Sequence, residues 1–250
     1  FVYATNLLAN FDAAGNQILD EQYTWDGSDW RGIKKEEYTF VNKQQTSIII
    51  YEWDSTNKQF IGKTKSIYNF DSKKNKILDE QYIWGDGDWV GTTQKEYAYN
   101  AQGQQIMYAY YTWKNNAWVG TQKEEKTLDA EGRVSELATY KWKNNKWTGD
   151  KKEAYSYTAD GQIATYITSV WNITTWKNSL KYEYFYNEAG VNYQTITYTW
   201  KNNKWELTSK NTNTYDDKGR LILVMTENWD GSEQIGGNKT TNTYGEFGLI

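Results

Sequence analysis

The sequence contains no cysteine, no histidine and no proline. Without cysteine the chain can form neither disulfides nor thiolate metal sites, and it has no acceptor for a lipoprotein anchor. Without histidine it lacks the usual general base, pH switch and imidazole ligand. The absence of proline fits a chain made almost wholly of β-ladder, because proline is confined to sheet edges and bulges. The sequence therefore predicts no metal site, and we expect no cofactor.

The chain also lacks long apolar runs and a large net charge, and both features restrict the class of protein. No apolar run approaches the roughly 20 residues that a membrane-spanning helix needs. The net charge is only −4, with 28 basic and 32 acidic residues mixed along the chain, which leaves no electrostatic footprint for nucleic acid or for an anionic membrane. We expect neither a nucleic-acid partner nor membrane insertion. Aliphatic residues are sparse and 17% of residues are aromatic, so any core must be built from rings.

What the chain does contain is a repeat marked by aromatic residues. An anchor residue recurs every 29 positions, except for one step of 30 between Phe40 and Phe70: Phe11, Phe40, Phe70, Tyr99, Leu128, Tyr157, Tyr186, Tyr215 and Tyr244. All 14 tryptophans fall in two columns of this repeat, which Phe60 completes: Trp25, Trp53, Trp84, Trp113, Trp142, Trp171, Trp200 and Trp229, then Trp30, Phe60, Trp89, Trp118, Trp147, Trp176 and Trp205. A fixed period of this length indicates units that are stable only against their neighbours. We therefore expect residues 1–250 to form a single continuous array.

One unit, residues 99–127, predicts the local structure. Residues 99–103 are a turn signature, residues 106–113 are rich in β-forming residues, and residues 114–117 form a second polar turn. Each unit therefore reads as one β-hairpin, and the short turns make neighbouring strands antiparallel. A lone return strand, with Phe1 in the second aromatic column, precedes eight hairpins. The predicted fold is all-β, an antiparallel meander of about eight 29-residue hairpins and about 17 strands. In the irregular second unit we expect a distorted turn after Phe40 and preserved strands.

Strict alternation along each strand predicts one aromatic face and one polar face. It places Trp89 with Tyr97 on the return strand and Tyr82 with Trp84 on the outgoing strand. A one-sided apolar sheet must cover that side, by coiling on itself, by forming a hollow shell, or by covering its rings with long side chains. Because neighbouring strands rotate by roughly 20°, we expect a curled or superhelical sheet with an aromatic inner face. A closed barrel of this many strands would leave a lumen too wide to fill.

The turn at residues 215–221, Tyr-Asp-Asp-Lys-Gly-Arg-Leu, matches the Tyr-Asp-x-x-Gly-Arg-Leu core of YD (RHS-type) repeats, and residues 128–134 match it more loosely. Together with the paired tryptophans, the chain resembles Trp- and Tyr-rich surface repeat proteins of Bacteroidetes-type bacteria, most of them uncharacterised. The resemblance implies a secreted protein or one at the outer face of the cell surface. The chain opens at Phe1 without a methionine or a signal peptide; a mature secreted product or a cloning boundary would both look like this, and we expect the first.

The rings have two interpretations. Tryptophan and tyrosine bind the apolar faces of sugars, and Glu21 and Glu80 lie beside such rings in equivalent segments. Alternatively, every ring recurs because each unit stacks on the next, and Glu21 pairs with Lys34 across the strand. A residue present in all units is better explained by architecture, so we assign both aromatic columns to packing. The acidic residues also recur or lie in turns, which leaves no unique carboxylate pair for glycoside hydrolysis and no calcium site. We expect no enzymatic activity.

Two classes of function remain, with a glycan-active enzyme as a remote third. The first is an extracellular binding or adhesion module for a glycan or a surface protein. The second is a mechanical spacer or shell without a ligand. Binding should appear as aromatic residues that break the repeat on the polar face, because contiguous exposed apolar area marks interaction sites. The candidate binding residues are Tyr108, Tyr110, Tyr166, Phe185 and Tyr193.

Overall fold

The fold is the predicted all-β meander. The computed structural model describes residues 4–245 and 248–249, so Phe1 lies outside the described residues. Seventeen strands form one open antiparallel sheet, and two short strands, β18 (Tyr244–Gly245) and β19 (Gly248–Leu249), pair after it. The described part of the chain contains no helix, and hence none long and apolar enough to cross a membrane.

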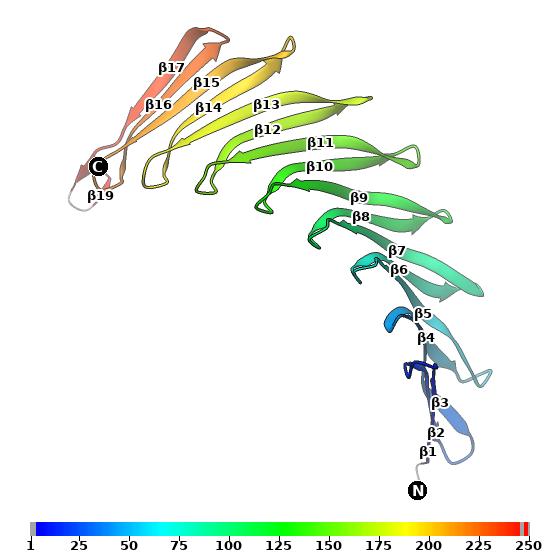
Figure 1. Cartoon of the computed structure of the whole chain (residues 1–250). Coiled ribbons are helices and arrows are strands. Elements are labelled where there is room, and N and C mark those ends of the chain that lie inside the picture. The colour runs from blue at the N-terminus through cyan, green and yellow to red at the C-terminus, as the bar shows by residue number, and fades with distance from the viewer. Residues whose placement is uncertain (1–3, 246–247, 250) are drawn as a thin grey trace. The chain divides into compact units, whose positions relative to one another are not determined.

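The strands alternate between outgoing and return strands of successive hairpins (Figure 1). The return strands are β1 (Thr5–Phe11), β3 (Trp30–Val41), β5 (Gln59–Phe70), β7 (Asp88–Tyr99), β9 (Ala117–Leu128), β11 (Lys146–Tyr157), β13 (Thr175–Tyr186), β15 (Lys204–Tyr215) and β17 (Glu233–Thr241). The outgoing strands are β2 (Gln17–Trp25), β4 (Gln44–Asp54), β6 (Lys76–Gly85), β8 (Gln105–Lys114), β10 (Val134–Lys143), β12 (Ile163–Asn172), β14 (Asn192–Lys201) and β16 (Leu221–Asp230).

The chain divides into two compact units. The first contains Phe1–Glu125 with Lys141–Trp147, and the second contains Lys126–Tyr140 with Thr148–Ile250. In the first unit each strand from β1 to β9 pairs with its neighbours in the sequence. In the second unit the strands from β11 to β17 do the same. Within each unit successive strands are rotated relative to one another (Figure 1). The single continuous array stays a prediction.

Two kinds of turn join the strands. The hairpin turns place asparagine in the left-handed region, as at Asn115 and Asn116 with φ of 50° and 59°, the geometry that matches strand twist. The acidic turns are held by their aspartate: Asp216 Oδ1 accepts the backbone N–H groups of Lys218 (3.0 Å) and Arg220 (2.8 Å). In the irregular second unit the acidic turn shrinks to two left-handed residues, 42–43, while the strands on both sides persist.

Each hairpin whose register is described contains a β-bulge near its hairpin turn. Between β6 and β7, Tyr82 lies opposite Gly91, but the next residue, Gln81, lies opposite Thr93, so Thr92 has no cross-strand partner. The same one-residue shift recurs in the other hairpins for which both strands are described together, two positions earlier in the last of them. Beyond the extra residue, the side chains of the return strand change faces.

This bulge overturns the prediction that Trp89 and Tyr97 share a face. Tyr97 lies opposite Tyr108, and alternation puts Tyr108 and Tyr111 on opposite sides of β8. Tyr111 packs against the tryptophan layer, with its ring 5.8 Å from Trp142. The sheet therefore has two aromatic layers rather than one aromatic and one polar face. We name the side that carries both tryptophan columns the tryptophan face, and the side that carries Tyr97, Tyr108 and their equivalents the tyrosine face.

The tryptophan face is built from edge-to-face pairs that fit over glycines. Trp113 and Trp118 face each other across their hairpin turn with ring centroids 4.9 Å apart at 77°. Their rings lie over Gly91 of the preceding return strand, where an added Cβ would be 2.8 Å from Trp113 and 2.9 Å from Trp118. Aromatic rings cover the equivalent glycines in the same way, at Gly32, Gly62, Gly120 and Gly149. The close contact between ring and backbone explains why glycine follows the second aromatic by two positions in these units.

The core of each unit is thin. Among the described residues only small or polar side chains and one ring fall in the buried class, with Ala109 at 0% exposure. Most tyrosines and tryptophans are half-buried. Each hairpin is thus stabilised mainly by its two neighbours, as expected for a repeat protein.

Candidate functional site

Tyr108 and Tyr110 lie on the tyrosine face of β8, in the first unit. The ring of Tyr108 is 5.6 Å from Tyr97 at 45°, directly across the strand pair. Both predicted binding residues are half-buried, and burial raises the pKa of the Tyr108 hydroxyl. Tyr108 therefore belongs to a cross-strand contact.

Tyr166 is part of a tyrosine stack in the second unit. Its ring lies 5.2 Å from Tyr155 at 30° and 5.9 Å from Tyr182 at 24°. Glu153 accepts the hydroxyls of Tyr166 (2.5 Å) and Tyr155 (3.0 Å), and also pairs with Lys151 at 2.5 Å. Burial first, and then the hydrogen bond to Glu153, raise the pKa of Tyr166. These rings stack on one another, so their flat surfaces are covered and are not open to a ligand.

Phe185 and Tyr193 form an exposed pair of rings in the second unit. Their centroids are 6.5 Å apart with an angle of 52°, and the residues are 36% and 37% exposed. Bulges on β13 and β14 bring them together: Ser179 and Tyr193 have no cross-strand partner, so Phe185 changes face and Tyr193 turns toward it. The pair lies on the tryptophan face, whereas Tyr166 lies on the tyrosine face. The prediction that both belong to one polar face was wrong for this reason.

The pair departs from every other hairpin whose register is described. The position of Phe185 is taken by small or polar residues: Asn10, Thr39, Asn69, Ala98, Ser156 and Thr214. The bulge position of Tyr193 is taken by Ile18, Thr46, Ile77, Ile106, Ala164 and Ile222. No packing requirement of the repeat therefore explains two rings here.

Polar groups next to the pair are held in place. The Asn192 side-chain amide donates to the backbone carbonyls of Phe185 (3.2 Å) and Gln194 (3.1 Å). The Gln194 amide donates to the Thr212 hydroxyl at 3.0 Å. The Asn192 amide oxygen accepts the Thr195 hydroxyl at 3.2 Å, so the Gln194 amide oxygen is the acceptor that these bonds leave beside the rings. The combination of exposed ring and fixed amide can bind a ligand that has both apolar and hydroxyl surfaces.

The carboxylates near the tryptophan columns are engaged within the protein. Glu80 accepts the Tyr82 hydroxyl at 2.7 Å, and Glu21 accepts that of Tyr23. Glu21 does not pair with Lys34 as predicted: Lys34 contacts Asp20 at 2.7 Å and Glu36 at 3.0 Å. The bulge of the β2–β3 hairpin is the cause, because it turns Lys34 to the tyrosine face. The tryptophan columns themselves contact one another across their turns.

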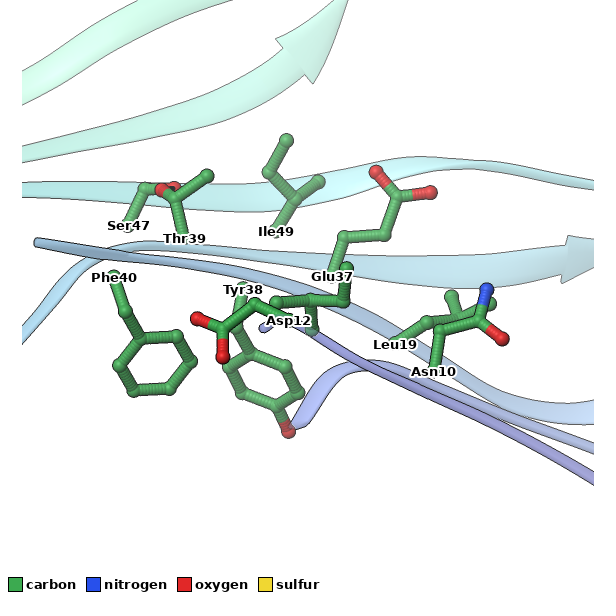
Figure 2. A pocket seen from close by; sticks show the side chains of 10 residues that line it. Asn10, Asp12, Leu19, Glu37, Tyr38, Thr39, Phe40, Ser47 and Ile49 are labelled. Atoms are coloured by element: carbon green, nitrogen blue, oxygen red, sulfur yellow. Dashed lines mark hydrogen bonds between the residues drawn. The ribbon is translucent and has the colours of Figure 1, made fainter. Parts of the chain in front are cut away.

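A hollow of about 510 Å³ in the first unit lies beside the acidic-turn ends of β1 to β4. Figure 2 shows the Tyr38 and Phe40 rings on one side of the strands and Ile49 on the other. The two carboxylates that line the hollow both accept hydrogen bonds from other side chains of the protein. Glu37 accepts the Tyr51 hydroxyl at 2.7 Å, and Asp12 accepts the side chain of Asn16, which lowers the pKa of Asp12. The hollow thus offers no free acid–base pair, and no group of three metal-ligating side chains occurs in the described residues.

Comparison with known proteins adds no functional assignment. No family model matches the sequence, and no curated protein gives a significant match. The structure is similar to a DUF3836 family protein from Bacteroides vulgatus (19% identity, 34% of this chain and 88% of that chain, TM-score 0.29). It is also similar to a protein of unknown function from Bacteroides fragilis (16% identity, 59% of this chain and 91% of that chain, TM-score 0.21).

A third similar structure is the Tc holotoxin pore of Photorhabdus luminescens (11% identity, 96% of this chain, TM-score 0.32), of which the chain spans 15% of the length. The similar structures thus include Bacteroides proteins and a Tc toxin. At these scores they carry no argument about function. The resemblance to YD repeats stays a prediction.

Proposed function

We propose that the chain is a non-catalytic binding module, secreted or at the bacterial cell surface, that recognises a glycan. The observation that supports it is the exposed Phe185–Tyr193 pair, which occupies positions that carry no ring in the other described hairpins. Rings bury large apolar area at a small cost in side-chain entropy, and sugars combine apolar faces with hydroxyls. The acceptor oxygen of Gln194 beside the rings complements those hydroxyls. The extracellular location rests on the resemblance to exported repeat proteins.

The test is a glycan array probed with the purified chain, followed by titration of each hit. The double variant Phe185→Ser/Tyr193→Ser should weaken binding at least about tenfold, because a ring at the centre of a contact contributes on the order of 1 kcal/mol or more. Met225→Ser is the matched control, since Met225 lies on the same face and is 37% exposed. Unchanged binding by the double variant would remove this site.

The second candidate is a spacer without a ligand. It is favoured by the number of rings that serve contacts between neighbouring hairpins, as in the stack of Tyr155, Tyr166 and Tyr182. A chain that binds neither glycans nor surface proteins, and whose double variant is as stable as the original, would support the spacer.

A further inference from the structure

The hairpin of β16 and β17 breaks the tryptophan packing at two positions. Its second aromatic is replaced by Gln234, ten residues before Tyr244. The glycine that such a ring would cover, on the preceding return strand, is replaced by Leu207. Leu207 corresponds to Gly120, and Gln234 corresponds to Trp147, in the repeat three units earlier. The two departures therefore concern a single ring-binding place.

The equivalent site around Gly120, in a hairpin that keeps its second aromatic, shows which contacts the ring makes. The Trp147 ring lies 5.6 Å from Tyr111 at 67° and donates its indole N–H to the Tyr111 hydroxyl at 3.0 Å. It also lies over Gly120, where an added Cβ would be 2.5 Å from the ring. Phe60 and Trp176 make the equivalent contacts with Tyr23 (5.5 Å) and Tyr140 (6.3 Å). In each case a ring from one hairpin fills the space beside a tyrosine of the hairpin before it.

In the last hairpin this space is a hollow. A cavity of about 420 Å³ is lined by Tyr198, Trp205 and Leu207, the residues equivalent to Tyr111, Trp118 and Gly120, together with Lys204, Glu206 and turn residues 230–232. Gln234 is exposed and does not line it.

Two further contacts describe this hairpin. The backbone N–H of Gly231 donates to the Leu207 carbonyl at 3.1 Å, which holds the turn at the rim. The indole N–H of Trp229 is buried without a hydrogen-bond partner, a sign that the packing of this hairpin is incomplete.

We propose that this hollow binds one aromatic ring, the indole of a tryptophan side chain presented by a partner protein. The ring uses the space left by the missing second aromatic of the last hairpin, but it lies above the Leu207 side chain rather than against a bare glycine, and it also contacts Tyr198 and Trp205. The volume lies within the range of about 300–1,000 Å³ typical of ligand sites. Glu206 and Asp230 are also among the residues that line the hollow, so oxygen acceptors for an indole N–H are present at its rim.

The rim also favours a neutral ring over a charged ligand. Glu206 is paired with Lys204 at 3.3 Å, so a free anion or cation would have to compete with this ion pair. A neutral indole leaves the Lys204–Glu206 ion pair intact and adds apolar contacts with Trp205 and Leu207. Among aromatic side chains tryptophan buries the largest area and provides a donor, which is why it dominates such anchor positions.

The test uses N-acetyl-tryptophanamide as the probe and the whole chain as the receptor. In a titration followed by NMR, the indole N–H signals of Trp205 and Trp229 should shift, while that of Trp113, in an intact repeat, should stay unchanged. N-acetyl-leucinamide should bind at least about tenfold more weakly. Binding of methyl glucoside in place of the tryptophan amide, or shifts at Trp113 alone, would overturn the proposal.

Two variants check the same place. Leu207→Gly/Gln234→Trp restores the repeat pattern and fills the hollow, so binding of the probe should be lost. Gln234→Ala is the control at the same position and should leave binding unchanged, because Gln234 does not line the hollow. The hollow lies at the hairpin-turn end of β15, whereas Phe185 and Tyr193 lie near an acidic turn. Failure here is therefore separate from failure of the proposed glycan site.

Discussion

The indole of Trp113 lies against the α-carbon of Gly91, so closely that an added Cβ would be 2.8 Å from the ring. Real Cβ atoms do not approach other heavy atoms to that distance, and neither partner is free to move. Trp113 is held by Trp118 across its turn, and Gly91 is fixed in the ladder opposite Tyr82. This contact makes glycine a packing residue here rather than a turn residue.

Gly91→Ala should destabilise the chain by about 1–3 kcal/mol, the usual cost of overpacking a close-packed contact. The free energy of unfolding from urea denaturation measures it. Gly85→Ala in the same hairpin is the control, since its added Cβ would be 3.7 Å from the nearest side chain, that of Val90. The control should be neutral or gain up to about 1 kcal/mol. Equal effects of the two substitutions would show that the ring does not need the glycine.

Ile173→Asn should stabilise the chain by up to about 1 kcal/mol. Ile173 adopts a φ of 58° in the β12–β13 turn and is 88% exposed. A β-branched residue in this left-handed region costs about 1–2 kcal/mol, while asparagine tolerates it. The equivalent residues Asn115, Asn144 and Asn202 have φ of 50°, 50° and 47°. Thermal and urea midpoints measure the gain, and Ile173→Val, which keeps the β-branch, should show none.

Stability should fall in acid below about pH 4. Backbone hydrogen bonds from Arg220, then its side chain, lower the pKa of Asp216. Because the folded-state pKa is below the ordinary value of about 3.9, this contribution is complete above that pH and is lost as the pH falls through the folded-state pKa. Hydrogen bonds from the Asn75 side chain act in the same way on Asp71. Asp216→Asn keeps the acceptor oxygen, so it should flatten the acid limb of a urea-midpoint profile. A steeper limb would contradict the assignment.

Stability should also fall in alkali, between about pH 10 and 12. Burial, then the hydrogen bond to Glu183 at 2.9 Å, raise the pKa of Tyr198 to about 12. A raised folded-state pKa means that the contribution is complete below the unfolded value of about 10 and is lost as the pH rises through 12. Tyrosinate absorbance and circular dichroism should therefore change together in this window. Tyr198→Phe removes one such group and should make the decline shallower; independent titration of Tyr198 without unfolding would refute the prediction.

The hairpins were predictable because each boundary has a local chemical cause. The left-handed Asn115–Asn116 pair and the aspartate-held acidic turns are set by residues only a few positions apart. The faces were not predictable from alternation, because one extra residue, such as Thr92, reverses every side chain beyond it. A signal does exist in the strand lengths: β9 has 12 residues and β8 has 10. The longer strand of such a pair can hold the extra residue of a bulge.

The candidate site shows the same limit. The sequence pattern predicts Tyr108 and Tyr166 as exposed rings, but the cross-strand register places Tyr97 and Tyr155 directly against them. That register cannot be read from either strand alone. The gap at Gln234 was visible in the aromatic column, whereas its position beside the hollow at Leu207 depends on how the last hairpin packs. Departures from a repeat can be identified in the sequence. Which of these departures lie next to each other can be determined only once the pairing of the strands is known.

The glycine beneath five of the aromatic pairs, at positions 32, 62, 91, 120 and 149, also has a consequence for folding. Nearly identical hairpins could dock on one another in several registers, and a slip would cost few backbone hydrogen bonds. A hairpin displaced along β7 to the next residue on the same face would place its indole over Trp89 in one direction or, beyond the bulge, over Gln94 in the other, and the ring would meet a side chain. The glycine therefore allows only one register between neighbouring hairpins while the chain folds. Where Leu207 replaces the glycine this restriction on the register is missing, and the last hairpin leaves the hollow at Leu207 unfilled.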